Sequence, residues 1–244
     1  MLQEEFVQTG GWLFRWRSYV PLVFAAALFA SLSGFSYPLG SHFLDQAWDL
    51  VCFGVSLCGF AVRIVTVGFV PRDTSGRNTR GQVALAVNTT GMYSILRHPL
   101  YFGNFWMWMG VALFPRVWWM PPLTALAFIV FYERIMFAEE RFLSEKFAPD
   151  YSIWAEKTPV FWPVFRNWSK PALPFSWRAV LRRENSTFLG ITVAFNVLEV
   201  TGTRIVEGEW EADWLWLSML VFALLLYAVP KALKKLKWLN EPGR

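Results

Sequence analysis

Six apolar runs divide this 244-residue chain, and their length constrains the fold more strongly than any other feature of the sequence. The runs lie at residues 19–37, 48–70, 100–114, 118–132, 188–206 and 214–229. A helix needs about 20 apolar residues to cross a bilayer, and several of the runs approach that length. Charged residues make up 17% of the chain, whereas soluble proteins carry roughly 25%. We therefore expect an all-α integral membrane protein with about six transmembrane helices.

The third and fourth runs are short for separate crossings, and Pro115, Pro121 and Pro122 lie at the turn between them. We interpret this pair of runs as a tilted helical hairpin. A re-entrant pair, which enters and leaves the membrane on the same side, is the structural alternative.

The basic residues are concentrated in segments that alternate with turns of little positive charge. They occur before the first run, in the two long loops at 71–99 and 133–187, and after the last run. Because such residues are enriched on the cytoplasmic side, the pattern places both termini and both long loops in the cytoplasm. We expect a bacterial inner membrane rather than the endoplasmic reticulum. Topology accounts for most of the net charge of +5, which therefore requires no nucleic-acid partner.

The chain shows no internal repeat or separate soluble domain, and we expect a single multi-pass domain over residues 1–244. Its parts are N-terminal helices at 1–58, a central core at 59–165, and a basic linker with two C-terminal transmembrane helices at 166–244. The linker is expected to extend to about Glu184. Cys52 and Cys58 have no metal-type spacing with either histidine, so we expect packing thiols and no metal site.

The segment from Arg97 to Gly103, with the sequence Arg-His-Pro-Leu-Tyr-Phe-Gly, places polar side chains at the predicted start of the third membrane helix. Free backbone N–H groups and the helix dipole favour an anion there, and Pro99 suits the first helical turn. Arg97 adds a positive charge, and His98 adds a hydrogen-bond donor. These features suit a small zwitterion or a nucleotide-like ligand. The alternative is anchoring at the membrane interface, where such residues are common.

An acidic pair, Glu139-Glu140, follows this basic motif after two apolar runs. Two crossings return a chain to the side that it left, so the basic motif and the acidic pair can meet at one membrane face. Adjacent carboxylates repel, and burying one of them is costly without a cation from the motif or from a ligand. The alternative is a solvated helix end that pairs with Arg134 and Arg141.

The sequence after the acidic pair predicts a helix on the membrane face. Between Arg141 and Trp154, large apolar side chains recur at helical spacing, while the charged residues fall elsewhere. Pro149 is expected to kink or break this helix. The segment from Thr158 to Pro163 must be extended, because residues that precede proline avoid the α region.

Taken together, these motifs resemble the isoprenylcysteine carboxyl methyltransferase and phospholipid methyltransferase superfamily. The resemblance covers roughly residues 59–163 and rests on three patterns: RHPxYxG from Arg97, EExxL from Glu139 and FxxxYxxW from Phe147. It implies an all-helical membrane enzyme that binds S-adenosylmethionine in a cytoplasmic-side pocket. It also implies methylation of a lipidic substrate that arrives from the bilayer.

The resemblance assigns roles to individual residues. It implies that Glu139 or Glu140 pairs with the methionine amino group, while Arg97 binds the methionine carboxylate or shapes the loop. The aromatic side chains that would close over the adenosine are Phe147, Tyr151 and Trp154. The implied cofactor-binding set comprises Gly91, Tyr93, His98, Pro99, Tyr101, Gly103, Asn104, Glu139, Glu140 and Tyr151. The chain departs from the family's common residues at Ala148 and Trp154, which affects the geometry of this lid.

Arg63 lies inside the second apolar run, about two turns before its end. An arginine inside a membrane is costly and is therefore a functional candidate by default. It resembles an arginine that the carboxyl methyltransferases place near the acceptor group. We therefore interpret Arg63 as catalytic, together with Arg97 and Glu140, with Arg63 holding an anionic acceptor; snorkelling to the headgroups is the alternative. Glu199 in the fifth run could pair with Arg63 or Arg204, or contact a headgroup.

We expect S-adenosylmethionine-dependent methyl transfer to a membrane lipid whose headgroup is anionic, a phosphate or carboxylate, or an amine. Transfer to an anion needs little acid–base catalysis, so positioning and exclusion of water would dominate. One alternative is an NADPH-dependent sterol-type reductase, since those enzymes share a similar Arg-His-Pro-x-Tyr helix. Another is a non-catalytic membrane protein that binds lipids or partners through its basic loops.

Overall fold

The computed structural model describes residues 2–17, 19–71 and 84–241, and the regular structure of these residues is entirely helical. Four of the helices are long and apolar enough to cross a membrane: α3 (His42–Phe69), α6 (Met120–Phe147), α8 (Trp177–Glu207) and α9 (Trp214–Lys235). The all-α membrane fold is therefore confirmed. α2 (Val20–Ser31) and α5 (Pro99–Leu113) occupy the other two predicted runs with only 12 and 15 residues, so the predicted number of six crossings is not confirmed.

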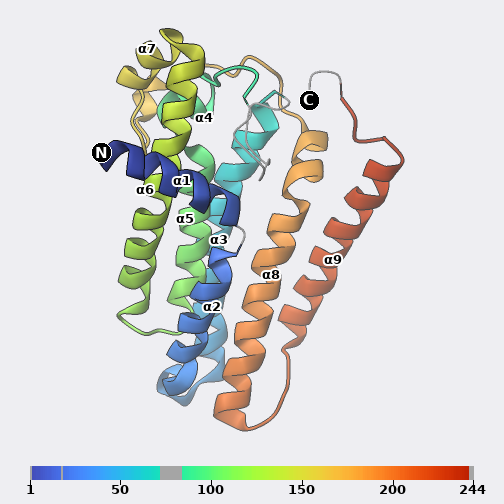
Figure 1. The fold of residues 1–244 in the computed structure, drawn as a ribbon. Coiled ribbons are helices and arrows are strands. Elements are labelled where there is room, and N and C mark those ends of the chain that lie inside the picture. Colours follow the sequence, from blue (N-terminus) through green and yellow to red (C-terminus); the bar gives the residue numbers. More distant parts are fainter. Residues whose placement is uncertain (1, 18, 72–83, 242–244) are drawn as a thin grey trace.

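The long helices run side by side in one bundle (Figure 1). α3 packs against α5 and α8, α5 also packs against α6, and α9 packs on α8. The short helices α4 (Met92–Ile95) and α7 (Asp150–Lys157) lie together where α5 begins and α6 ends, at what we call the motif end (Figure 1). The opposite end, called the turn end, holds the start of α3 and the turn between α8 and α9 (Figure 1).

The predicted membrane orientation depends partly on basic residues of the first long loop. Three of them, Arg72, Arg77 and Arg80, lie outside the described residues. The placement of both termini in the cytoplasm therefore stays a prediction.

Small residues allow α3 and α5 to approach closely. A Cβ atom at Gly103 on α5 would lie 2.7 Å from both the Gly59 carbonyl oxygen and the Arg63 Cγ atom, so a larger residue does not fit without displacing them. Ser56 Oγ on α3 donates a hydrogen bond to the Met107 carbonyl oxygen at 2.9 Å. Membrane helices commonly pack through small residues in this way. The contact places the Arg63 side chain directly against α5.

The helix that carries the acidic pair ends as the sequence predicts. α6 stops at Phe147, and α7 begins immediately after Pro149, so the predicted break at this proline is confirmed. The chain therefore turns over the motif end at this point (Figure 1).

An amphipathic N-terminal helix, α1 (Leu2–Trp16), is absent from the sequence predictions and lies across α6 (Figure 1). Arg134 Nη1 on α6 donates to Thr9 Oγ1 at 3.2 Å, and the Arg134 guanidinium lies 4.6 Å from the centre of the Phe6 ring. Arg141 instead pairs with Glu145, one turn further along α6. These two arginines therefore contact other groups, and the alternative that they pair with Glu139-Glu140 is wrong.

α8 begins at Trp177, inside the segment that was predicted to be a basic linker as far as Glu184. Ser176 caps its first turn, because Ser176 Oγ accepts a hydrogen bond from the Ala179 backbone N–H at 3.0 Å. The linker is thus shorter than predicted. As a consequence, Glu184 becomes part of α8 and is buried in the bundle, with 2% of its surface exposed.

Aromatic rings fill the bundle core between α3, α8 and α9. The Phe53 ring lies edge-on to Phe195 and to Trp216, with centroids 5.2 and 5.6 Å apart, and all three side chains are buried. Edge-to-face packing of this kind stabilises the contact beyond the apolar area that it buries. The core therefore fixes the helix positions near the turn end.

Candidate active site

The Arg-His-Pro motif and the acidic pair meet at the motif end, as the sequence predicts. Arg97 Nη1 lies 2.7 Å from Glu140 Oε2, and His98 Nε2 lies 2.9 Å from Glu140 Oε1. α5 begins at Pro99, which occupies the expected first helical position. Both oxygens of the Glu140 carboxylate thus contact the basic motif. His98 and Glu140 are 42 residues apart in the sequence.

Glu139 has a separate set of partners within the same cluster. The Tyr101 hydroxyl donates a hydrogen bond to Glu139 Oε1 at 2.8 Å, and His98 Nδ1 lies 3.8 Å from Glu139 Oε2. The His98 and Tyr101 rings are stacked, with centroids 5.6 Å apart. His98 therefore lies between the two carboxylates and is itself buried, with 7% of its surface exposed.

Aromatic side chains from α4 and α7 close this cluster. Tyr151 on α7 is buried, and Trp154 Nε1 donates to the Tyr93 carbonyl oxygen at 3.1 Å. Burial raises the pKa of the Tyr151 and Tyr93 phenols, and the nearby carboxylates, Glu140 for Tyr151 and Glu139 for Tyr93, raise it further. Both phenols therefore stay protonated at neutral pH and act as neutral hydrogen-bonding groups.

The segment after α7 is hydrogen-bonded to the motif loop. The Arg97 backbone N–H donates to the Pro159 carbonyl oxygen at 2.8 Å, and the Gly91 N–H donates to the Ser169 carbonyl oxygen at 3.0 Å. Gly91 has a φ of 60°, a conformation that favours glycine. These contacts fix the loop on which Tyr93, Arg97 and His98 depend for their positions.

Arg63 lies beside this cluster in a hydrogen-bond network of its own. Its Nε and Nη2 atoms lie 2.9 and 2.8 Å from the two oxygens of Glu184, and its Nη1 atom lies 2.7 Å from Asn104 Oδ1. Asn104 Nδ2 in turn donates to the Tyr132 hydroxyl at 3.2 Å. Among the alternatives considered for Glu199, pairing with Arg63 is wrong, because the Arg63 guanidinium contacts both oxygens of Glu184. Glu184 and Tyr132 gave no signal in the sequence, since each meets its partner only through helix packing.

Gly103 belongs to the cofactor-binding set that the resemblance implies. In the structure its open Cβ position faces α3, against Gly59 and Arg63. Its small size thus serves helix packing, and the close approach is to another helix.

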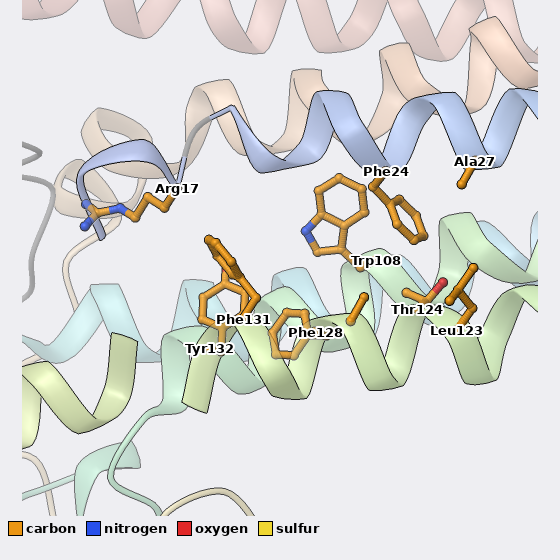
Figure 2. Close-up of a pocket in the computed structure, with 10 residues that line it drawn as sticks. Arg17, Phe24, Ala27, Trp108, Leu123, Thr124, Phe128, Phe131 and Tyr132 are labelled. Carbon is orange, nitrogen blue, oxygen red and sulfur yellow. The ribbon is translucent and has the colours of Figure 1, made fainter. Parts of the chain in front are cut away.

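A cavity of about 250 Å³ lies between α2, α5 and α6 (Figure 2). Its wall is mostly aromatic and aliphatic and includes Phe24, Trp108 and Phe128. Arg17 and Tyr132 lie at one end of it (Figure 2). The Tyr132 ring is 4.7 Å from the Tyr101 ring, so this end of the cavity adjoins the Tyr101–Glu139 pair. The sequence gave no indication of the cavity.

Comparison with known proteins agrees with the sequence resemblance. Residues 50–150, which contain both motifs, match the phospholipid methyltransferase family. The nickel-cobalt-cadmium resistance protein of Alcaligenes xylosoxydans xylosoxydans is 29% identical over 156 residues, which cover 63% of this chain and 73% of the relative. The cobalt-zinc-cadmium resistance protein of Cupriavidus metallidurans is 33% identical over 150 residues, which cover 61% of this chain and 62% of that relative. No solved structure matches the chain.

Proposed function

We propose that this membrane chain, whose residues 50–150 match the phospholipid methyltransferase family, transfers a methyl group from S-adenosylmethionine to a lipidic acceptor in the membrane. The observation that carries the proposal is the cluster of Arg97, His98, Tyr101, Glu139 and Glu140, in which His98 is buried and the other side chains are partly buried, and which adjoins an apolar cavity. The cluster supplies both signs of charge, and the cavity supplies an apolar surface.

The chemistry of the cluster fits the cofactor. S-adenosylmethionine carries an ammonium, a carboxylate and an electrophilic methyl group on a sulfonium sulfur. Glu139 and Glu140 are suited to bind the ammonium. Arg97 Nε is buried and has no hydrogen-bond partner among the described residues, so it is available to the carboxylate of a ligand. Tyr151 and Trp154 close the site over the remaining part of the ligand and exclude water.

The cavity suits the apolar part of the acceptor. Among the described residues that line it, Arg17 alone carries a formal charge, and Arg17 lies at the end next to Tyr132 (Figure 2). A cationic side chain favours an anionic headgroup over an ammonium headgroup at this position. We therefore assign the acceptor as a lipid with an acidic polar group, whose apolar chain lies between α2 and α6.

An acceptor that reaches the site as an anion needs no proton removed before it reacts. The chain then contributes positioning and a site without water, and no general base is required. In this scheme Arg63 is a positioning residue. It holds Asn104, which orients the Tyr132 hydroxyl at the junction of cavity and cluster.

Calorimetric titration of the purified protein with S-adenosylmethionine tests the cofactor assignment. Glu140→Gln removes the charge that Arg97 and His98 share, and loss of a charged hydrogen-bond partner should weaken binding about 10- to 100-fold. Glu145→Gln is the matched control, because Glu145 lies on the same helix but is exposed and pairs with Arg141. Equal affinities for both variants, or heat released by NADPH and none by S-adenosylmethionine, would overturn the assignment.

A second candidate function is suggested by the names of the relatives. One is named for resistance to nickel, cobalt and cadmium and the other for resistance to cobalt, zinc and cadmium, and each aligns with more than half of this chain. We propose that this chain also contributes to resistance to such ions. Growth of a gene-deletion strain in nickel, cobalt, cadmium and zinc salts tests this, with complementation by wild type and by Glu140→Gln. Growth equal to that of the parent strain in all four salts would refute it.

A further inference from the structure

We propose that the turn end of the bundle carries a binding site for a divalent transition-metal ion. The site is formed by a group of five residues that we call the acidic cluster: His42, Asp45, Asp49, Glu199 and Asp213. They come from the start of α3, the end of α8 and the residue before α9. These segments meet at the end of the bundle opposite the candidate active site (Figure 1).

The ligand atoms of the cluster lie close enough to share an ion. One oxygen from each of Asp45, Asp49 and Glu199 lies within 4.8 Å of the others. A ring nitrogen of His42 and one oxygen from each of Glu199 and Asp213 also lie within 4.8 Å of one another. Atoms that bind one metal at about 2.0–2.2 Å are at most about 4.4 Å apart. A small rotation of the side chains therefore brings either set into coordination distance. Glu199 belongs to both sets and lies at the centre of the site.

Asp49 is the strongest indication that this cluster binds a cation. It is 0% exposed, and neither of its carboxylate oxygens accepts a hydrogen bond from an N–H or hydroxyl donor among the described residues. Glu199 is 3% exposed, and its Oε2 atom is likewise without such a partner. Buried carboxylates are normally paired or bound to a metal. Glu184, by comparison, is equally buried, and Arg63 engages both of its oxygens.

The charges near the cluster favour binding of a divalent cation. Arg116 Nη1 lies 2.7 Å from Asp45 Oδ1, so the guanidinium balances Asp45. The same arginine is held in place, because its Nη2 atom donates to the Ser36 carbonyl oxygen at 2.9 Å. If Asp49 and Glu199 are both ionised, their two negative charges have no cationic side chain of their own among the described residues. One divalent ion neutralises them both.

The partly exposed side of the cluster provides a route for the ion. His42 Nε2 lies 3.4 Å from Asp213 Oδ2, and these side chains are 43% and 27% exposed. Gln46 Nε2 donates to Asp213 Oδ2 at 3.2 Å, which orients that carboxylate. An ion can therefore meet His42 and Asp213 first and reach Asp49 and Glu199 behind them.

The donor set indicates the class of metal. Imidazole nitrogen suits zinc, cobalt and nickel ions, whereas magnesium and calcium prefer oxygen ligands alone. One histidine with several carboxylates therefore favours a first-row transition metal. Without such an ion, a proton shared between Asp49 and Glu199 is the remaining way to neutralise one of the two carboxylates. The metal-bound state and the protonated state differ in whether the chain binds an added metal ion.

Metal titration of the full-length chain in detergent micelles distinguishes them. After treatment with a chelator, the protein is titrated with Co²⁺, followed by its visible absorption, and with Zn²⁺ by calorimetry. We expect one ion per chain. The isosteric variants Asp49→Asn and Glu199→Gln should weaken binding at least about 10- to 100-fold, and His42→Ala should also weaken it. Glu207→Gln is the control, because Glu207 is an exposed carboxylate on the same helix outside the cluster.

Two results would overturn the metal site. The first is the absence of binding in the wild-type chain, which would leave the shared proton as the explanation. The second is equal binding in the cluster variants and in Glu207→Gln. If a core variant fails to fold, the partly exposed His42→Ala carries the test. S-adenosylmethionine binding, measured on the same samples, reports the candidate active site separately, so failure of one site does not imply failure of the other.

Discussion

Loss of the Glu184 carboxylate should destabilise the bundle, because it leaves Arg63 buried without its partner. Glu184 is 2% exposed and Arg63 is 14% exposed, and two contacts of 2.8 and 2.9 Å join them. The substitution Glu184→Leu introduces an apolar side chain of comparable size and removes both acceptor oxygens. The Asn104 side chain then still accepts a hydrogen bond from the guanidinium, but it carries no charge.

The size of the effect follows from this burial. Removing one partner of a buried ion pair typically costs about 3–5 kcal/mol, because the other charge stays in an apolar environment. In a chain of this length, 1 kcal/mol shifts the melting temperature by roughly 2–4 °C. We therefore expect the apparent melting temperature of Glu184→Leu to fall by roughly 6–20 °C.

Thermal unfolding of the purified variants, followed by circular dichroism at one scan rate, measures this. The double variant Arg63→Met with Glu184→Leu should recover most of the loss, since it removes both charges. Glu145→Ala is the control, because it breaks an exposed Arg–Glu pair on α6 and should change stability by no more than about 0.5 kcal/mol. A Glu184→Leu variant as stable as Glu145→Ala, or a double variant no better than the single one, would refute the reasoning.

Three further predictions concern the motif end. Gly103→Ala should destabilise the chain by about 1–3 kcal/mol through overpacking against α3, which a lower melting temperature would show. Gly190→Ala on α8 is the control and should not lower the melting temperature, because a Cβ atom there meets nothing beyond its own helix within 4 Å. Arg97→Lys keeps the charge but removes the unpartnered Nε donor, so calorimetry should show about tenfold weaker S-adenosylmethionine binding, and unchanged affinity would exclude this donor as a contact. Burial raises the pKa of the Tyr151 phenol in the folded chain, and the charge of Glu140 raises it further. Above about pH 10 the phenol is therefore deprotonated in the unfolded chain before it is deprotonated in the folded chain, so the stability of the folded chain falls as the pH rises. Tyr151→Phe should lose less stability than wild type in alkaline melting curves, and equal losses would contradict the pKa shift.

Local patterns in the sequence predicted much of the motif end. Pro99 at the first position of α5 and the break at Pro149 follow from the missing N–H and restricted backbone of proline. The meeting of His98 with Glu140 follows from chain length alone, because two adjacent apolar runs return the chain to one side of the bundle. These predictions succeeded because each depends on neighbouring residues or on the number of helices between two motifs.

Other features could not be found in this way. Continuous apolar runs do not indicate α1, because this helix is amphipathic and its apolar residues are interspersed with charges. The start of α8 was missed because its first turns are basic and were interpreted as linker, although Ser176 supplied a capping signal. The absence of metal-type Cys and His spacing was used to exclude a metal site, but that rule does not detect carboxylates that come together from separate helices.

The sequence alone determined that the chain is an all-α membrane protein with a basic motif and an acidic pair at one end, since hydrophobic length and proline chemistry are local properties. Which distant side chains pair depends on how the helices pack. Arg63 pairs with Glu184 rather than with Glu199, and Glu199 lies beside Asp49 at the other end of the bundle. Helix packing also forms the cavity beside Tyr132. The reason is physical: pairing across a bundle depends on the rotation and offset of each helix, which close packing at residues such as Gly103 sets and which no local pattern records.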